Sequence, residues 1–110
     1  MTGKLTTHVL DTAAGKPGAG ISLTLHRIEN GHPRKMAETI TNADGRTDHP
    51  LLAGADFQAG IYEISFAVGA YFQSGFFDAI PIRFRVDDPG AHYHVPLLCS
   101  PWSYSTYRGS

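Results

Sequence analysis

Two histidines, His92 and His94, have the type and spacing that acid–base chemistry requires. Alternate side chains of an extended strand point to the same face, so the two imidazoles would stand roughly 6–7 Å apart. Imidazole gains and loses protons near neutrality, which suits a general acid or base. The pair predicts a working surface on an otherwise structural sheet.

A third histidine, His8, lies in the β-patterned residues 5–11. If Thr7 and Val9 face the core, His8 faces away from it, and the same alternation over residues 93–99 turns His94 outward. The two imidazoles would then share one outer sheet face, provided that their strands are neighbours. A lone strand histidine is more often structural than catalytic, because a buried polar group needs only a partner.

Arg46 follows Asp44 and Gly45, and the spacing leaves two interpretations open. Arg46 is either an exposed arginine on a turn or a binding residue. In the second case its planar guanidinium would present rigidly arranged N–H donors to an oxyanion or a planar heterocycle. The ending, residues 104–110, is aromatic and rich in hydroxyls, which favours a docked tail over a frayed one.

A zinc site needs separate consideration. Catalytic zinc takes three protein ligands and a water, and His8, His92 and His94 could supply three imidazoles. Cys99, however, has the wrong alternation to join His94, and no carboxylate is near in sequence. We therefore expect no metal and no cofactor, and we expect Cys99, the sole cysteine, to be a small core residue.

Short β-patterned runs alternate with turns rich in Gly, Pro, Asn and Asp, which predicts one all-β domain over residues 1–110. The expected architecture is a two-sheet β-sandwich of seven to eight strands with one short helix at residues 70–74. Pro96 predicts an edge strand or a bulge, since proline cannot donate to a ladder. The expected strands are residues 5–11, 21–28, 35–41, a very short 46–48, 61–68, 80–86, 93–99 and 104–108, with a loop at 49–59.

Composition excludes several classes of protein. The formal net charge is -1 and the Lys and Arg residues are scattered, so no nucleic-acid partner is expected. No apolar run approaches the roughly 20 residues of a membrane helix. Residues 1–4 lead directly into a patterned segment, which leaves no room for a secretory signal and favours the cytoplasm. A signal removed before this numbering would instead indicate the periplasm.

Three stretches together resemble the transthyretin-like 5-hydroxyisourate hydrolases: residues 5–11 with Gly15-Lys16-Pro17, residues 41–46 and residues 92–110. The ending Tyr107-Arg108-Gly109-Ser110 is specific to those hydrolases, and transthyretin, the hormone carrier on the same fold, lacks it. The carrier also has other residue types where this chain has His8, Arg46 and His94. The resemblance covers nearly the whole chain but is loose in the middle.

The resemblance implies a transthyretin-like sandwich of two four-stranded sheets and a homotetramer built as a dimer of dimers. It also implies that Pro96 lies on an interior strand, at a bulge or facing a channel between dimers. It implies cofactor-free hydrolysis of 5-hydroxyisourate to 2-oxo-4-hydroxy-4-carboxy-5-ureidoimidazoline in urate degradation, a part of purine metabolism. His8 and His94 would activate water and relay protons, and Arg46 would stabilise the oxyanion. The residues implied in substrate binding are His8, Arg46, Tyr107, Arg108 and Ser110, with His92 in support.

Two alternatives stay open. A binding module of the transthyretin type would carry an aromatic ligand in a channel between subunits. A purely structural sandwich domain would have no site, and it predicts that His8, Arg46 and His94 lie far apart.

Overall fold

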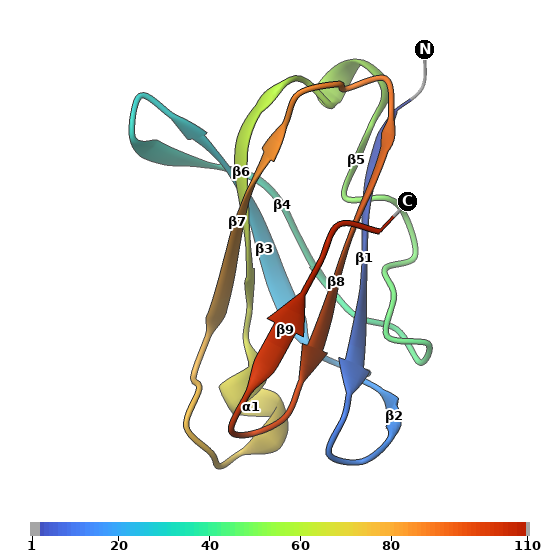
Figure 1. Ribbon diagram of the computed structural model, residues 1–110, viewed down its shortest axis with the longest axis vertical. Coiled ribbons are helices and arrows are strands. Elements are labelled where there is room, and N and C mark those ends of the chain that lie inside the picture. Colours follow the sequence, from blue (N-terminus) through green and yellow to red (C-terminus); the bar gives the residue numbers. More distant parts are fainter. Residues whose placement is uncertain (1–2, 110) are drawn as a thin grey trace.

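Two β-sheets packed face to face make up the computed structural model, which describes residues 3–109 (Figure 1). One sheet has the order β2-β1-β8-β9, with β5 also pairing with β1, and the other has the order β4-β3-β6-β7. The strands are β1 (Lys4–Asp11), β2 (Lys16–Pro17), β3 (Ser22–Glu29), β4 (His32–Ile40), β5 (Leu52–Ala53), β6 (Gly60–Phe66), β7 (Ile80–Val86), β8 (His92–Cys99) and β9 (Tyr104–Thr106). A 3-10 turn, η1 (Gly54–Asp56), and one short helix, α1 (Val68–Phe72), complete the described fold.

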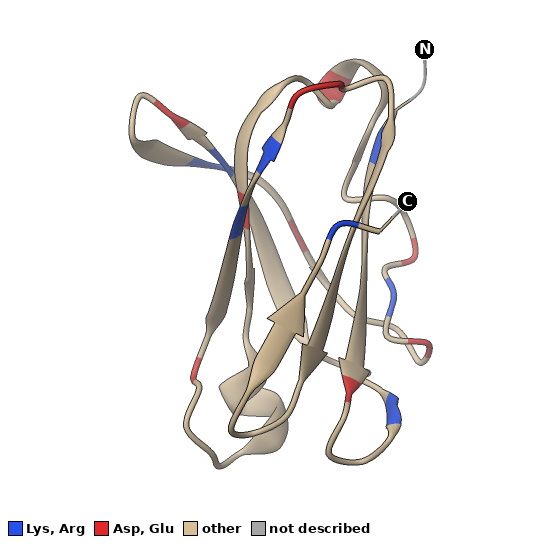
Figure 2. Cartoon of the chain, viewed as in Figure 1, with Lys and Arg blue, Asp and Glu red and all other residues tan. Residues whose placement is uncertain are grey.

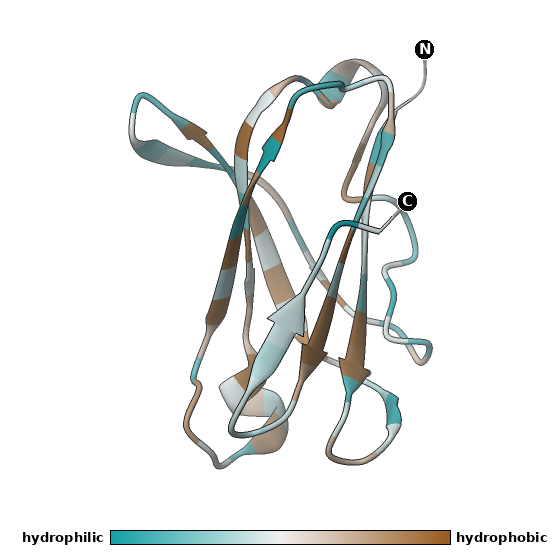
Figure 3. Cartoon of the chain, in the orientation of Figure 1, coloured by the Kyte–Doolittle hydropathy of each residue, from teal (hydrophilic) through white to brown (hydrophobic). Residues whose placement is uncertain are grey.

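The core lies between the sheets, where alternate residues of each strand meet. Leu5 and Val9 of β1 are fully buried, as are Tyr62, Ile64 and Phe66 of β6. Figure 3 shows that hydrophobic residues concentrate in the strands and that the turns are mostly hydrophilic. Fully burying an aliphatic side chain contributes about 1.5–3 kcal/mol, so this alternation stabilises the sandwich and also forces the other face of each strand outward.

The predicted two-sheet sandwich with one short helix is confirmed, with differences in detail. The strand expected at residues 46–48 is wrong, because Arg46 makes only a single bridge, to His8. The expected loop at 49–59 contains β5 and η1, and α1 begins at Val68, two residues earlier than predicted. Strand β2 was not expected, and β9 ends at Thr106.

Pro96 lies on an interior strand, as the resemblance implies, and without a bulge, so the edge strand or bulge expected from proline itself is wrong. The parallel register of β1 and β8 runs unshifted from residue 92 to residue 99, and β8 lies between β1 and β9. The Pro96 carbonyl accepts a hydrogen bond from Thr106 Oγ1 at 2.7 Å. A strand residue directs its N–H and its C=O to the same side, so an N–H at position 96 would point toward β9. The ladder between β8 and β9 has no pair at residue 96, so the N–H that proline lacks leaves no ladder hydrogen bond unmade.

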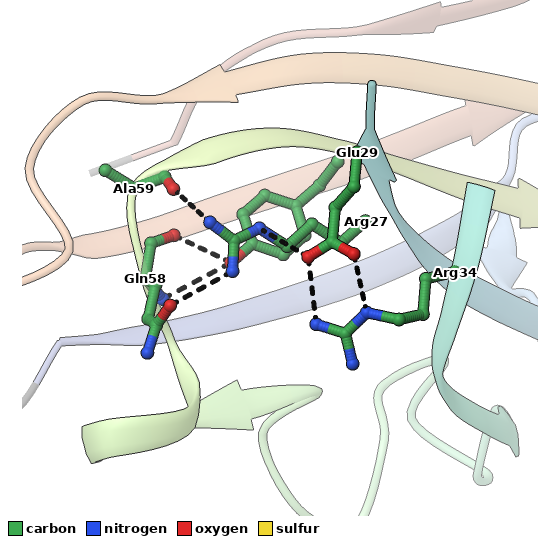
Figure 4. A network of polar contacts seen from close by, with 6 residues as sticks. Arg27, Glu29, Arg34, Gln58 and Ala59 are labelled. Atoms are coloured by element: carbon green, nitrogen blue, oxygen red, sulfur yellow. Dashed lines mark hydrogen bonds and ion pairs between the residues drawn. The ribbon is translucent and has the colours of Figure 1, made fainter. Parts of the chain in front are cut away.

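A polar network ties the β3–β4 hairpin to the loop before β6 (Figure 4). Arg27 donates to Gln58 Oε1 at 3.1 Å and to the Ala59 carbonyl at 2.7 Å. Glu29 pairs with Arg34 at 2.9 Å and 3.0 Å, and this contact lowers the pKa of the Glu29 carboxyl. The ion pair is exposed, and such pairs contribute little, so this is a structural tie and not a site.

Charge is spread thinly over the molecule. Figure 2 shows Lys and Arg interspersed with Asp and Glu rather than gathered in one stripe. Arg83 is exposed and pairs with Glu63 at 3.0 Å, as expected for a solvated sheet face. Among residues 3–109 no helix is both long and apolar enough to cross a membrane.

Candidate active site

The parallel pairing of β1 and β8 assembles the site. In this register Lys4 lies opposite His92, Thr6 opposite His94 and His8 opposite Pro96. Thr7 and Val9 are buried, so Thr6 and His8 point outward, as the alternation predicted. The histidines from two distant parts of the chain therefore share one outer sheet face, and the structural-domain alternative, which required them to be scattered, is contradicted.

A single hydroxyl links the two β8 histidines. Thr6 Oγ1 lies 2.7 Å from His92 Nε2 and 2.8 Å from His94 Nδ1. The two imidazole centroids are 6.1 Å apart, within the spacing predicted for an i, i+2 pair on a strand. His92 is exposed and His94 is half-buried, so the two rings have different access to water.

Arg46 reaches this face from a compact turn that flanks β1. The Asn42 side-chain oxygen accepts the backbone N–H groups of Asp44 (2.9 Å) and Arg46 (3.1 Å). Gly45 has φ +76°, a left-handed conformation that favours glycine, and its carbonyl accepts the Val9 N–H at 2.8 Å. The turn is thus tied to β1, and it brings Arg46 into a backbone bridge with His8.

His8 is held by the same turn. Its Nε2 lies 2.9 Å from the Asp44 carbonyl oxygen. A carbonyl can only accept, so His8 Nε2 carries a proton and donates it. In the neutral ring this leaves Nδ1 as the free lone pair, which restricts the part that His8 can play as a base.

The surroundings of His94 favour its neutral form. Its pKa lies below the ordinary 6.5, first because of burial and then because of electrostatic interaction with Arg46, His92 and His8. A neutral imidazole is the form that accepts a proton, and a base whose pKa lies near or below the working pH is ready to act. His94 is therefore the best-placed general base among these residues.

These side chains surround a hollow of about 400 Å³. Its lining includes the predicted Arg46, His92 and His94 but not His8, whose Nε2 bonds to the Asp44 carbonyl. Sequence reasoning missed Lys4, Thr6, Asp48 and His49. Lys4 and Thr6 alternate with the buried residues of β1, as His8 does, so the same pattern could have placed them on the outer face. Asp48 and His49 lie in a loop, where no periodic pattern predicts side-chain direction. The full lining is Lys4, Thr6, Thr7, Arg46, Thr47, Asp48, His49, Pro50, His92 and His94.

The segment after β9 continues past the arrow of β9 and then bends across β8 (Figure 1). The Gly109 N–H donates to the His94 carbonyl at 2.7 Å, so the tail is docked as far as Gly109. Tyr107 and Arg108 do not join the hollow within one chain. They line a smaller hollow between β7 and β8, where the Arg108 guanidinium lies 4.2 Å from the centre of the Tyr93 ring. Ser110 lies outside the described residues.

A metal site requires several ligands that converge on one point. Within residues 3–109 no three His, Cys, Asp or Glu side chains are arranged to hold an ion. The His92 and His94 nitrogens named above are both directed at Thr6 Oγ1. Cys99 is fully buried and burial raises its thiol pKa to about 11, as expected of a core residue rather than a thiolate ligand.

The arrangement suits the hydrolysis of a small polar substrate. A neutral imidazole can take a proton from water, and a nearby guanidinium can stabilise the negative charge that develops on a carbonyl oxygen. Both groups border an open hollow, where water and a flat ring can enter.

Comparisons with known proteins give the same indication. Residues 5–109 match the family described as the HIUase/Transthyretin family. A 5-hydroxyisourate hydrolase from Ralstonia nicotianae is 55% identical over 116 residues, covering 98% of this chain and 99% of the relative. The solved Klebsiella pneumoniae 5-hydroxyisourate hydrolase superposes with a TM-score of 0.85 at 34% identity, covering 98% of this chain and 99% of that one. Sea bream transthyretin, solved in complex with thyroxine, gives 0.89 at 27% identity, with 96% and 94% covered.

Proposed function

Because the chain belongs to the HIUase/Transthyretin family, we propose that it hydrolyses 5-hydroxyisourate to 2-oxo-4-hydroxy-4-carboxy-5-ureidoimidazoline in urate degradation. The observation that carries the proposal is that His94 and Arg46 line one open hollow, in which burial and the Arg46 charge lower the His94 pKa. The names of the Ralstonia and Klebsiella relatives support the choice of substrate.

The first step adds water to a ring carbonyl. His94 Nε2 accepts a proton from water as the water oxygen bonds to the carbonyl carbon, and the electron pair of the C=O bond moves to its oxygen. Arg46 donates to this oxyanion. We assign the base to His94 rather than His8, because His94 lines the hollow and His8 does not.

The second step opens the ring. The oxyanion collapses, the bond between the carbonyl carbon and the ring nitrogen breaks, and the nitrogen takes the proton from His94. The water oxygen stays in the new carboxyl group, which ionises. No covalent intermediate with the protein forms, and no metal or cofactor takes part.

The working assembly is a homotetramer, a dimer of dimers. Strand β9 is the last strand of its sheet among the described residues, and a second chain pairing along it would cover its free edge. Exposed aromatic side chains flank this edge: Trp102 (70% exposed), Tyr104 (40%) and Tyr107 (60%). In the tetramer, Tyr107, Arg108 and Ser110 would help to bind substrate across the interface. Light scattering should give the mass of four chains, and a fully active single chain of 11.9 kDa would contradict this.

An ultraviolet assay of freshly generated 5-hydroxyisourate tests the function. Purified protein should speed its decay, with or without chelator, and Arg46→Ala should lower the rate about a hundred- to a thousandfold, the usual loss for one oxyanion donor. Arg83→Ala is the matched control, since it removes an exposed arginine of the other sheet. Wild-type protein without activity would refute the hydrolase, and tight thyroxine binding without turnover would establish the carrier instead. Activity that disappears with chelator would indicate a metal site.

We propose that the reaction takes place in the cytoplasm. The one cysteine is buried and free, so the fold requires no oxidising compartment. Fractionation of the source cells should recover the protein with cytoplasmic markers, and recovery in a periplasmic extract would contradict this placement.

A further inference from the structure

The Thr6 hydroxyl bridges two imidazoles, and this imposes a direction on both hydrogen bonds. A hydroxyl has one proton, so it can donate to only one of His92 Nε2 and His94 Nδ1 and must accept an N–H from the other. The ring proton of His94 is therefore coupled to that of His92. No other group among the described residues is bonded to these two nitrogens.

We propose that Thr6 is a positioning residue that holds the His94 proton on Nδ1 and relays protons between His94 and His92. The inference rests on the proposed hydrolase function and deepens it. In the resting state His94 Nδ1–H donates to Thr6 Oγ1, and the Thr6 hydroxyl donates to His92 Nε2. His94 Nε2 is then the lone pair available to water.

The charges around the hollow favour this direction. The Arg46 guanidinium has N–H donors and no acceptor. A lone pair on His94 Nε2 is therefore favoured next to it over an N–H, which would place donor against donor. The opposite direction would put the neutral His94 proton on Nε2 and leave no base toward the hollow. The charged and titratable groups that face His94 are Lys4 and His8 from β1, His92 from β8, and Arg46, Asp48 and His49 from the loop.

The relay explains how a half-buried base beside a cation can hold a proton. As His94 Nε2 takes the proton from water, Nδ1 passes its proton to Thr6, and Thr6 passes its own to His92 Nε2. His94 is again neutral, now with its proton on Nε2, and the positive charge lies on exposed His92, where water solvates it. When the leaving nitrogen takes the His94 Nε2 proton, the two transfers through Thr6 reverse: His92 Nε2 returns a proton to Thr6, Thr6 returns one to His94 Nδ1, and the resting state is restored.

The test uses Thr6→Val, which removes the hydroxyl but keeps the branched shape, and Thr6→Ser, which keeps the hydroxyl. Thr24→Val is the matched control, because Thr24 is a half-buried outward threonine of β3 in the other sheet. Thr6→Val should lower kcat about ten- to a hundredfold, at or below the lower end of the usual contribution of general acid–base catalysis because His94 itself remains, with little change in KM. Thr6→Ser should restore most of kcat, and Thr24→Val should match wild type.

Nitrogen-15 NMR of the imidazoles gives a readout that does not depend on turnover. Neutral His94 in wild type and in Thr6→Ser should carry its proton on Nδ1, and Thr6→Val should lose this preference. Wild-type kcat and an unchanged His94 tautomer in Thr6→Val would overturn the proposal, as would a Thr6→Ser variant as slow as Thr6→Val. Wild-type protein that is inactive yet has the Nδ1–H tautomer would refute the hydrolase while supporting the role of Thr6 in setting the tautomer.

Discussion

Gly45→Ala should damage both the fold and the site. Gly45 has φ +76°, and a Cβ there would lie 2.3 Å from the Val9 carbonyl oxygen. Restoring an ordinary contact needs a backbone shift of about 1 Å. The left-handed conformation costs an alanine about 1 kcal/mol, and forced overpacking adds about 1–3 kcal/mol. Stability should fall by about 2–4 kcal/mol, which lowers Tm by about 8–16 °C in a domain of this size.

The same shift should displace Arg46, the next residue. A misplacement of about 1 Å in a catalytic group can reduce the rate about a hundredfold. The assay is hydroxyisourate decay at a temperature where thermal unfolding shows that the variant is still folded. Both effects arise from one contact, so they should appear together.

Gly20→Ala is the matched control. Gly20 also has φ +76°, but nothing lies within 4 Å of its added Cβ. This variant should lose about 1 kcal/mol and keep wild-type activity. A Gly45→Ala protein as stable and as active as Gly20→Ala would refute the argument that the Asn42–Arg46 turn positions Arg46. A Gly45→Ala protein that is less stable but fully active would show that this turn has only a structural role.

Three further predictions concern groups that touch the site or support it. The rate should fall as pH drops through the lowered His94 pKa, so the acid limb of the kcat/KM profile against pH should lie below 6.5. Arg46→Gln removes a positive charge that lowers this pKa, so the acid limb of that variant should move to higher pH. Gly109→Ala would place a Cβ 2.8 Å from His94 Cδ2. The variant should turn the His94 ring and lower kcat about tenfold, while Tm stays within a few degrees of wild type. An unchanged rate would mean that the ring moves aside without loss of function. Tyr71 donates to Asp11 at 2.8 Å, and burial and this bond raise its pKa to about 12. Between these two pKa values Tyr71 stays protonated in the folded protein but ionises in the unfolded chain, so the free energy of unfolding should fall as pH rises from 10.0 toward 12. Calorimetry of Tyr71→Phe should show about 1 kcal/mol less stability at neutral pH and no such alkaline decline.

Local pattern made much of the fold predictable. Alternation of apolar residues located β1, β3, β6, β7 and β8 to within two residues at each end, because burying one face of a strand requires that alternation. Strands without such a signal were missed or misplaced. Lys16–Pro17 and Leu52–Ala53 pair with β1 only because the folded chain brings them to its edge. Pro96 was misjudged because its missing donor falls in a gap opposite β9, which no local rule reveals.

The sequence by itself determined which residues could act. The i, i+2 spacing of His92 and His94 and the alternation around His8 assigned these imidazoles to outer sheet faces, since side-chain direction along a strand is a local property. Only the tertiary structure decided which of them meet and in what state. The parallel register of β1 with β8 places Thr6 between two histidines, and the Asn42–Arg46 turn occupies the His8 nitrogen and presents a guanidinium to His94. Register and loop docking depend on contacts between residues more than 30 positions apart, and a proton on an imidazole responds to those contacts, so neither can be read from spacing along the chain.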